Sequence, residues 1–107
     1  MAKIEDRIQL LRTLSDKELK TMEAKAHDYS GSGDCNRNIL ACERLGICNA
    51  ETGILIRIQD KMARLTTLLA NGETAKVAEP IEDTISDARN YLLILYHVWL
   101  DKKSEVK

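Results

Sequence analysis

The chain has 107 residues, of which 44% are hydrophobic and 31% are charged, a composition typical of a single globular domain over residues 1–107. The net charge of −1, from 16 basic and 17 acidic residues, lacks the basic excess that drives binding to duplex nucleic acid. The longest apolar stretch, residues 91–100, is far shorter than the roughly 20 residues that span a bilayer, so we expect a cytoplasmic protein without membrane contact.

The spacing of apolar residues predicts an all-α bundle of about five helices. The first covers residues 3–14, and a capping-box pattern at residues 15–18 predicts that a second begins there and runs to about residue 27. Two Gly and two Ser residues then interrupt the pattern, and a short third helix reaches Gly46. No segment alternates with period two for long enough to form a strand.

Two long helices are expected in the second half, over about residues 50–70 and 80–102. Asn49 suits the position before the first of them, and Pro80 suits the first turn of the second. Residues 91–100 are apolar nearly all round, which predicts contacts on several sides and therefore a homo-oligomer, a dimer or larger. The stripe expected to face the core of the last helix contains Ile81, Ile85, Ala88, Leu92, Leu95 and Trp99.

Cations border the apolar side of the helix over residues 50–70. Lys61 lies within the apolar arc, and Arg57 and Arg64 lie along its edge. Cations grouped in this way predict a site for phosphate or carboxylate groups. Pairing with Asp60 and with acidic residues of the last helix is the alternative explanation.

Acidic residues follow one face of the last helix. Glu79, Asp83 and Asp87 are spaced four residues apart, and Asn90 and Tyr91 continue the same face. Carboxylates one turn apart can converge on Mg²⁺, which takes oxygen ligands. An acidic first turn that suits the helix dipole is the alternative, although it accounts poorly for Asp87.

The segment around residues 27–33 is the expected loop between helices. Tyr29 could stack on a nucleobase and Lys25 could reach a phosphate group. The glycines match neither a GxGxxG pattern nor a P-loop, so a plain linker is the alternative.

Four segments together resemble one protein family. Residues 25–31 are similar to its K-x-x-D-Y-G segment, and residues 38–46 to its N-(F)…(L)-G element. Residues 60–65 read D-K-x-x-R-L, and residues 79–91 read E-x-x-x-D-T-x-x-D-x-x-N-Y. These patterns resemble the phage-encoded, all-helical "nucleotide modification associated" family, which implies phage nucleotide metabolism or base modification in the host cytoplasm.

The acidic helix also resembles, more weakly, the MazG-type all-α nucleoside triphosphate pyrophosphatases. In those enzymes Mg²⁺-bound carboxylates activate water against an α-phosphate, and the subunits associate in dimers or tetramers. This resemblance implies that Asp28, Glu43 or Asp60 supplies a carboxylate opposite the acidic helix.

Two functions are therefore expected. The first is a Mg²⁺-dependent hydrolase, similar to a nucleotide pyrophosphohydrolase, with Asp83 and Asp87 catalytic and both binding the metal with Glu79. The second is a non-catalytic nucleotide binder, such as a phage anti-defence protein that sequesters a cyclic nucleotide signal. A purely structural helical module is the third reading. The residues expected to bind the nucleotide are Lys25, Asp28, Tyr29, Asn38, Arg57, Lys61, Arg64, Asn90 and Tyr91.

Overall fold

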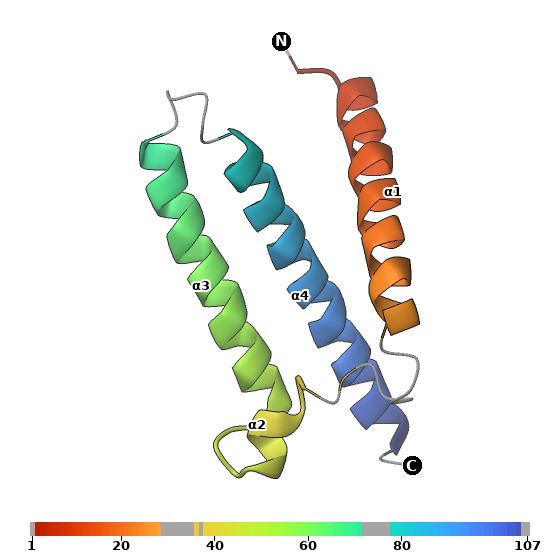
Figure 1. The fold of residues 1–107 in the computed structure, drawn as a ribbon, viewed down its shortest axis with the longest axis vertical. Coiled ribbons are helices and arrows are strands. Elements are labelled where there is room, and N and C mark those ends of the chain that lie inside the picture. Colours follow the sequence, from red (N-terminus) through yellow and green to blue (C-terminus); the bar gives the residue numbers. More distant parts are fainter. Residues whose placement is uncertain (1, 29–35, 37, 72–77, 106–107) are drawn as a thin grey trace. The chain divides into compact units, whose positions relative to one another are not determined.

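The computed structural model describes residues 2–28, 36, 38–71 and 78–105, without the side chains of residues 27, 28 and 78–80. The described residues contain helices and no strand, which confirms the expected all-α class (Figure 1). The chain divides into two units, Met1–Cys35 and Asn36–Lys107. The expectation of a single domain stays a prediction.

The first unit contains one helix, α1 (Ile4–Asp28). The predicted start of a new helix at residues 15–18 is wrong, because α1 runs through this segment without a break, so four helices are described where about five were expected. No Gly or Pro lies within α1, and Ser, Asp and Glu cost only a few tenths of a kcal/mol inside a helix. A capping box acts only where the chain leaves helical geometry, and no neighbouring residue favours such a departure here.

The second unit contains α2 (Ala41–Arg44), α3 (Ala50–Ala70) and α4 (Ala78–Glu105). Helices α3 and α4 lie side by side and run in opposite directions, forming the α3–α4 hairpin (Figure 1). The bounds of α3 match the predicted range of 50–70, whereas α4 extends beyond the predicted 80–102 at both ends. The third predicted helix is confirmed only in part, as the short α2, which lies before α3 and contacts it. The described residues 38–40, which were expected to be helical too, form a turn.

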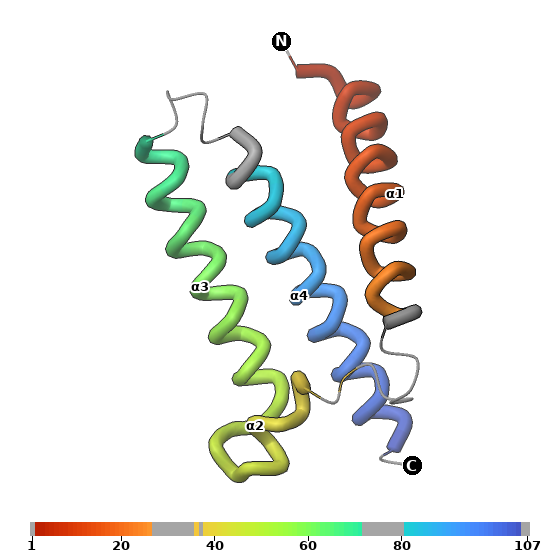
Figure 2. Tube along the Cα trace, in the orientation of Figure 1, coloured from red at the N-terminus to blue at the C-terminus, as the bar shows by residue number. Residues whose placement is uncertain are grey.

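A tight turn joins α2 to α3 (Figure 2). Gly46 has φ of +74°, the left-handed conformation that favours glycine, and the N–H of Ile47 donates to the carbonyl of Cys42 at 2.9 Å. Asn49 then caps α3, because its side-chain oxygen accepts a hydrogen bond from the N–H of Thr52 at 2.8 Å. These residues end one helix and begin the next where the sequence predicted both events.

The core of the second unit lies between α3 and α4 near this turn. Ala50, Ile54 and Val98 are buried there, at 0%, 1% and 2% exposure. Partly buried side chains pack around them: Ile39, Leu40, Ile58, Tyr91, Ile94 and Leu95.

The face of α4 that meets α3 differs from the predicted one. Among the described side chains of α4, Thr84, Ala88 and Val98 are buried. Leu92 and Trp99, which were expected to face inward, are 52% and 49% exposed. The apolar residues of α4 form two overlapping stripes, and α3 covers the one that contains Val98. Of the predicted inward stripe, only Ala88 is buried, and Leu95 packs at its edge.

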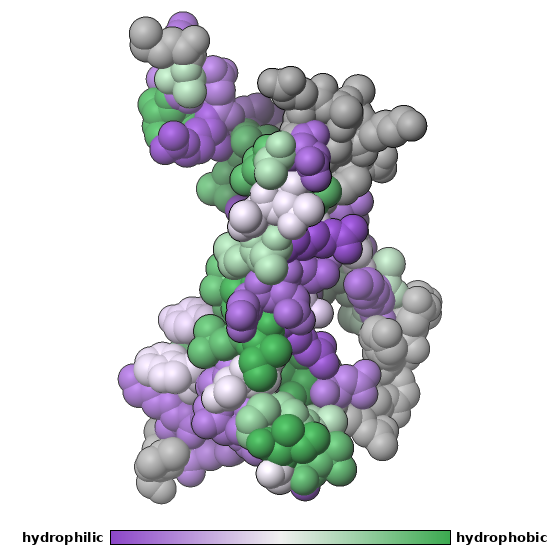
Figure 3. Space-filling model, turned by 90° about the vertical axis from the view of Figure 1, so that its left-hand side faces the viewer, coloured by the Kyte–Doolittle hydropathy of each residue, from purple (hydrophilic) through white to green (hydrophobic). Residues whose placement is uncertain are grey.

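Hydrophobic residues also lie on the surface of this unit. Leu45 and Ile47 of the α2–α3 turn are 74% and 73% exposed. Figure 3 shows hydrophobic residues gathered at the lower end of the view. None of the helices in the described part of the chain is both long and apolar enough to cross a membrane.

Candidate functional site

The predicted cations follow one side of α3. Arg57, Lys61 and Arg64 are spaced four and three residues apart, so they share a helix face. The Lys61 side chain is 25% exposed, while both arginines are on the surface. This arrangement presents positive charge along the edge of the surface that α3 buries against α4.

An ion pair joins this row of cations to α4. The Nζ of Lys61 lies 3.2 Å from Oδ2 of Asp87, whose side chain is 57% exposed. Pairing with acidic residues of the last helix, one of the two explanations for the cations, is thus confirmed for Lys61. Ion pairs as exposed as this contribute only about 0–1 kcal/mol, so a phosphate group can compete with Asp87 for the ammonium.

A second contact lies one helical turn away. The guanidinium carbon of Arg57 is 5.9 Å from the centre of the Tyr91 ring, a cation–π arrangement. Arg57 precedes Lys61 by one turn of α3, and Tyr91 follows Asp87 by one turn of α4, as antiparallel helices require. Four of the predicted site residues therefore lie together on one side of the α3–α4 hairpin.

Asn90 lies next to this group on α4. Its Oδ1 atom is buried and accepts no hydrogen bond from the described residues. A buried acceptor without a partner costs about 1–3 kcal/mol, so a ligand that donates a hydrogen bond to Oδ1 would recover that free energy.

The predicted metal ligands are described only in part. Asp83 and Asp87 are exposed on successive turns of α4, and the side chain of Glu79 lies outside the described residues. Among the described side chains, no group of three or more His, Cys, Asp and Glu residues could hold a metal ion. Mg²⁺ usually takes one or two protein carboxylates and several waters, so the Mg²⁺ site at these residues stays a prediction.

The remaining residues predicted to bind the nucleotide are Lys25, Asp28, Tyr29 and Asn38. Lys25 and Asp28 belong to α1, in the first unit, and the Asp28 side chain and Tyr29 lie outside the described residues. Asn38 is exposed in the turn before α2, where its carbonyl accepts a hydrogen bond from the N–H of Ala41 at 3.3 Å. Of these residues, only Asn38 belongs to the unit that contains Lys61, and it lies at the α2 end of that unit. The role of Lys25, Asp28 and Tyr29 in nucleotide binding stays a prediction.

A second charged cluster joins all three helices of this unit, and the sequence did not predict it. The Nζ of Lys102 in α4 lies 2.5 Å from Oε1 of Glu43 in α2 and 2.7 Å from Oε1 of Glu51 in α3. The N–H of Ala50 also donates to Oε1 of Glu43 at 3.1 Å. Spacing gives no signal for a contact between residues 59 positions apart.

These contacts shift two pKa values. The hydrogen bond from Lys102, followed by that from the N–H of Ala50, lowers the pKa of Glu43 below its ordinary value of 4.5. The hydrogen bonds to Glu43 and then to Glu51 raise the pKa of Lys102 above 10.5. Both groups are therefore held in their charged forms over a wide pH range.

This cluster is remote from the row of cations. Asp87 and Lys102 are 15 positions apart on α4, which is about 22 Å along the helix axis. Glu43, one of the carboxylates considered as a partner for the acidic helix, is thus engaged by Lys102 at the other end of the hairpin.

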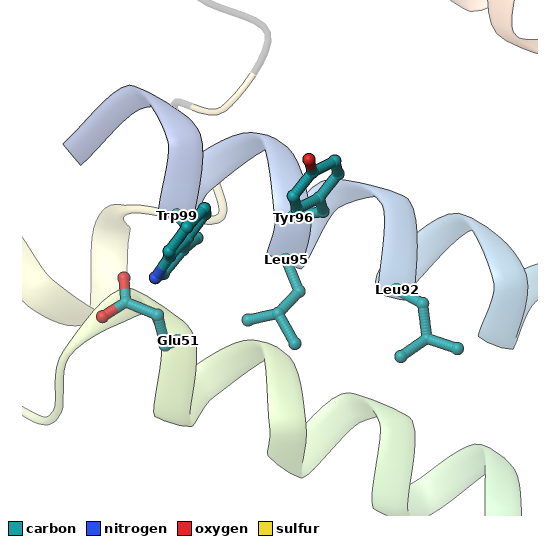
Figure 4. A pocket seen from close by; sticks show the side chains of 5 residues that line it. All are labelled: Glu51, Leu92, Leu95, Tyr96 and Trp99. Atoms are coloured by element: carbon teal, nitrogen blue, oxygen red, sulfur yellow. The ribbon is translucent and has the colours of Figure 1, made fainter. Parts of the chain in front are cut away.

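An open groove of about 460 Å³ lies between the two long helices, lined by Glu51 of α3 and by Leu92, Leu95, Tyr96 and Trp99 of α4 (Figure 4). The rings of Tyr96 and Trp99 are stacked, with centroids 6.1 Å apart and planes inclined by 16°. The groove is mainly apolar and aromatic, in contrast to the charged group around Lys61.

Comparison with family models, with curated proteins and with solved structures found no match for this chain.

Proposed function

We propose that this chain binds a nucleotide without hydrolysing it and holds the phosphate groups with Arg57 and Lys61. One observation carries the proposal: these two cations, one turn apart, face partners on α4 that a ligand can displace. Asp87 is more than half exposed, and the contact between Arg57 and Tyr91 is a cation–π interaction at the surface.

The neighbouring side chains supply groups suited to the rest of a nucleotide. A guanidinium group can hold phosphate oxygens in a bidentate manner, and an ammonium adds a compact charge. The ring of Tyr91 offers a surface on which a base can stack, and Oδ1 of Asn90 can accept a hydrogen bond from an exocyclic amino group. Arg64, one turn beyond Lys61, can reach a further phosphate of a longer chain.

A Mg²⁺-dependent pyrophosphohydrolase is the second candidate. It is favoured by the exposed carboxylates of Asp83 and Asp87 on successive turns of α4, with Glu79 one turn earlier in the sequence. Among the described side chains, Asp83 and Asp87 belong to no group of three acidic ligands that could hold a metal ion, and this observation is our reason for preferring the non-catalytic function.

The biological setting of the proposal comes from the sequence patterns. The similarity of residues 60–65 and 79–91 to the nucleotide modification associated family supports a phage protein that acts on nucleotides in the host cytoplasm. Sequestration of a cyclic nucleotide signal would suit a protein that binds such a ligand and leaves it intact.

We also propose that the chain self-associates. Support comes from the apolar residues that α3 leaves uncovered on α4, among them Leu92, Tyr96 and Trp99, all at least 49% exposed. Apolar surface concentrated on one helix is typical of protein–protein contacts.

A thermal-shift panel tests the binding proposal. Nucleoside mono-, di- and triphosphates and cyclic dinucleotides are added at about 1 mM, each with Mg²⁺ and with EDTA, because a ligand above its Kd raises Tm by mass action. We expect at least one nucleotide to raise Tm equally in both conditions and to be recovered intact by chromatography. Arg57→Gln and Lys61→Gln should each reduce the shift, whereas Arg12→Gln, which removes an exposed guanidinium from α1, should leave it unchanged.

Two results would contradict the proposal. A shift that needs Mg²⁺, accompanied by release of pyrophosphate, would establish the hydrolase instead. The absence of a shift with every nucleotide would remove nucleotide binding altogether and leave a structural helical module.

A further inference from the structure

Exposed apolar residues recur every seven positions on both long helices. Leu55, Met62 and Leu69 of α3 and Ile85, Leu92 and Trp99 of α4, together called the heptad face, are between 38% and 65% exposed. Seven residues make almost two helical turns, so each set of three lies along one line of its helix. This repeat is typical of helices that pack along their length against other helices.

The heptad face and the cations lie on different sides of the α3–α4 hairpin. On α4, Leu92 is five residues from Asp87, which places the two about 140° apart around the helix. On α3, Leu55 and Arg57 are about 160° apart by the same geometry. The groove of Figure 4, which contains Leu92 and Trp99, belongs to the heptad face.

Each long helix therefore has two apolar stripes. Partly buried residues such as Ile58 and Leu95 are packed where the helices meet, and the heptad positions lie three or four residues from them. In a pair of helices, each helix buries only one apolar stripe, whereas in a four-helix bundle each helix buries both. Among the described residues of the Asn36–Lys107 unit, nothing covers the second stripe.

We propose that the heptad face binds the same face of a second copy of this chain, with the two α4 helices antiparallel and crossing near Leu92. The inference rests on the self-association proposed above and is independent of nucleotide binding. An isologous dimer requires a self-complementary surface, in which each contact occurs twice.

The charges that flank the face agree with this arrangement. Glu82 precedes Leu92 by ten residues and Lys103 follows it by eleven, so they lie about 15 and 16 Å from the crossing point along the axis. In an antiparallel pair, Glu82 of each copy is level with Lys103 of the other copy. Parallel α4 helices would bring like charges together at both ends, which is unfavourable.

Sedimentation equilibrium of the full chain tests the proposal. The native chain should have about twice its 12.1 kDa mass at micromolar concentration. Leu92→Glu should raise the dimer Kd at least about a hundredfold with an unchanged helical CD spectrum, because it introduces a charge at the contact in both copies. Leu93→Glu is the matched control, since Leu93 is 54% exposed, against 52% for Leu92, and lies about 100° further round α4; it should remain dimeric.

Met62→Glu is a second variant, on α3, which tests the proposal if Leu92→Glu fails to fold. It should also raise the dimer Kd with an unchanged helical CD spectrum. A dimer that survives both variants overturns the heptad face but leaves self-association standing. A native chain that is monomeric at all concentrations overturns both the heptad-face dimer and self-association. This holds whether or not α1 or another protein covers the heptad face. The nucleotide panel applied to the monomeric variants should give the native thermal shift, so a failure of nucleotide binding is recognised separately.

Discussion

At the scale of single residues, the close packing around position 53 leaves no room for a side chain larger than that of glycine. A Cβ atom at this position would lie 2.8 Å from Sγ of Cys42 and 3.7 Å from Sγ of Cys48. The Cys42 thiol is itself close to two carbonyls, 3.6 Å from that of Ile39 and 3.7 Å from that of Asn49. Burial raises the pKa of the Cys48 thiol and its hydrogen bond with Cys42 adds to the effect, so uncharged sulfur fills the space next to Gly53.

Gly53→Ala should therefore destabilise the chain, although alanine is the better helix former. Crowding in a packed site costs about 1–3 kcal/mol, and the gain in helix propensity is about 1 kcal/mol. We expect the free energy of unfolding in urea to fall by about 1 kcal/mol.

The double variant Gly53→Ala, Cys42→Ala provides the control. Removing Sγ of Cys42 leaves room for the new methyl group, so the two substitutions should couple favourably in a double-mutant cycle. A Gly53→Ala chain as stable as the native one would show that the α2–α3 turn yields easily and that the close approach has no energetic consequence.

At the scale of the helices, the start of α3 depends on side chains that replace missing backbone partners. The first N–H groups of a helix have no acceptor within it. Asn49 accepts from the N–H of Thr52 at 2.8 Å, and Glu43 accepts from that of Ala50 at 3.1 Å. The α2–α3 turn thus places two acceptors beside N–H groups at the start of α3 that have no partner within the helix.

Asn49→Ala should lower the free energy of unfolding by about 1 kcal/mol, the usual value for loss of an N-cap. Asn49→Ser retains an oxygen acceptor and should stay within a few tenths of a kcal/mol of the native chain. Urea unfolding followed by CD measures both. If the alanine and serine variants were equally stable, the cap would make no contribution beyond that of Glu43.

The helix ends that the sequence predicted correctly are those that nearby residues determine. Asn49 and Gly46 act on the backbone within a few residues, so their effects can be read without knowledge of the fold. The pattern at residues 15–18 misled because the same residues are compatible with a helix interior, and α1 continues through them. Local patterns therefore predict helix ends well only where the chain must also change direction.

The face that each helix buries could be predicted only in part. Lys61 was expected within the apolar arc of α3, and it is three-quarters buried beside α4. On α4 the sequence offered two apolar stripes, and the packing of α3 on Val98 left Leu92 and Trp99 exposed. Which stripe is buried depends on the register between two helices, and no pattern within one helix contains that information.

The candidate site, too, could be predicted from the sequence only in part. The residue types were visible in the sequence, because cations and carboxylates recur at helical spacing on the two long helices. That Lys61 meets Asp87, rather than Asp83, depends on the antiparallel register. The Lys102 cluster was missed because its members come from three separate segments.

At the scale of the whole molecule, Lys102 connects the segments that form the Asn36–Lys107 unit. Its ammonium contacts Glu43 of α2 and Glu51 of α3 from the last turn of α4. The buried core near the turn is small, with Ala50, Ile54 and Val98 as its buried residues. The stability of this unit should therefore depend on the charge of these groups, and so on pH.

The two pKa shifts define the direction of this dependence. Because the folded-state pKa of Glu43 is lowered, its contribution is present above its ordinary value of 4.5 and is lost as the pH falls through the lowered value. Because the pKa of Lys102 is raised, its contribution is fully present below 10.5 and is lost as the pH rises through the raised value. Stability from this cluster is thus greatest between these limits and declines outside them.

Lys102→Met should remove the decline at high pH and weaken the one at low pH, because the hydrogen bond from the N–H of Ala50 to Glu43 remains. At pH 7 we expect the Tm of the variant to lie a few degrees below that of the native chain, since the methionine side chain keeps the packing but leaves Glu43 and Glu51 without their cation. The difference should shrink towards pH 3, where the carboxylates are protonated in both proteins. Lys103→Met is the control, because Lys103 lies 4.8 Å over the Trp99 ring instead of joining the cluster, and it should keep the native pH profile. Parallel Tm curves for the native and Lys102→Met chains from pH 3 to 7 would mean that the cluster is too well solvated to stabilise the fold, and that the apolar contacts of Ile54 and Val98 alone hold α4 on α3.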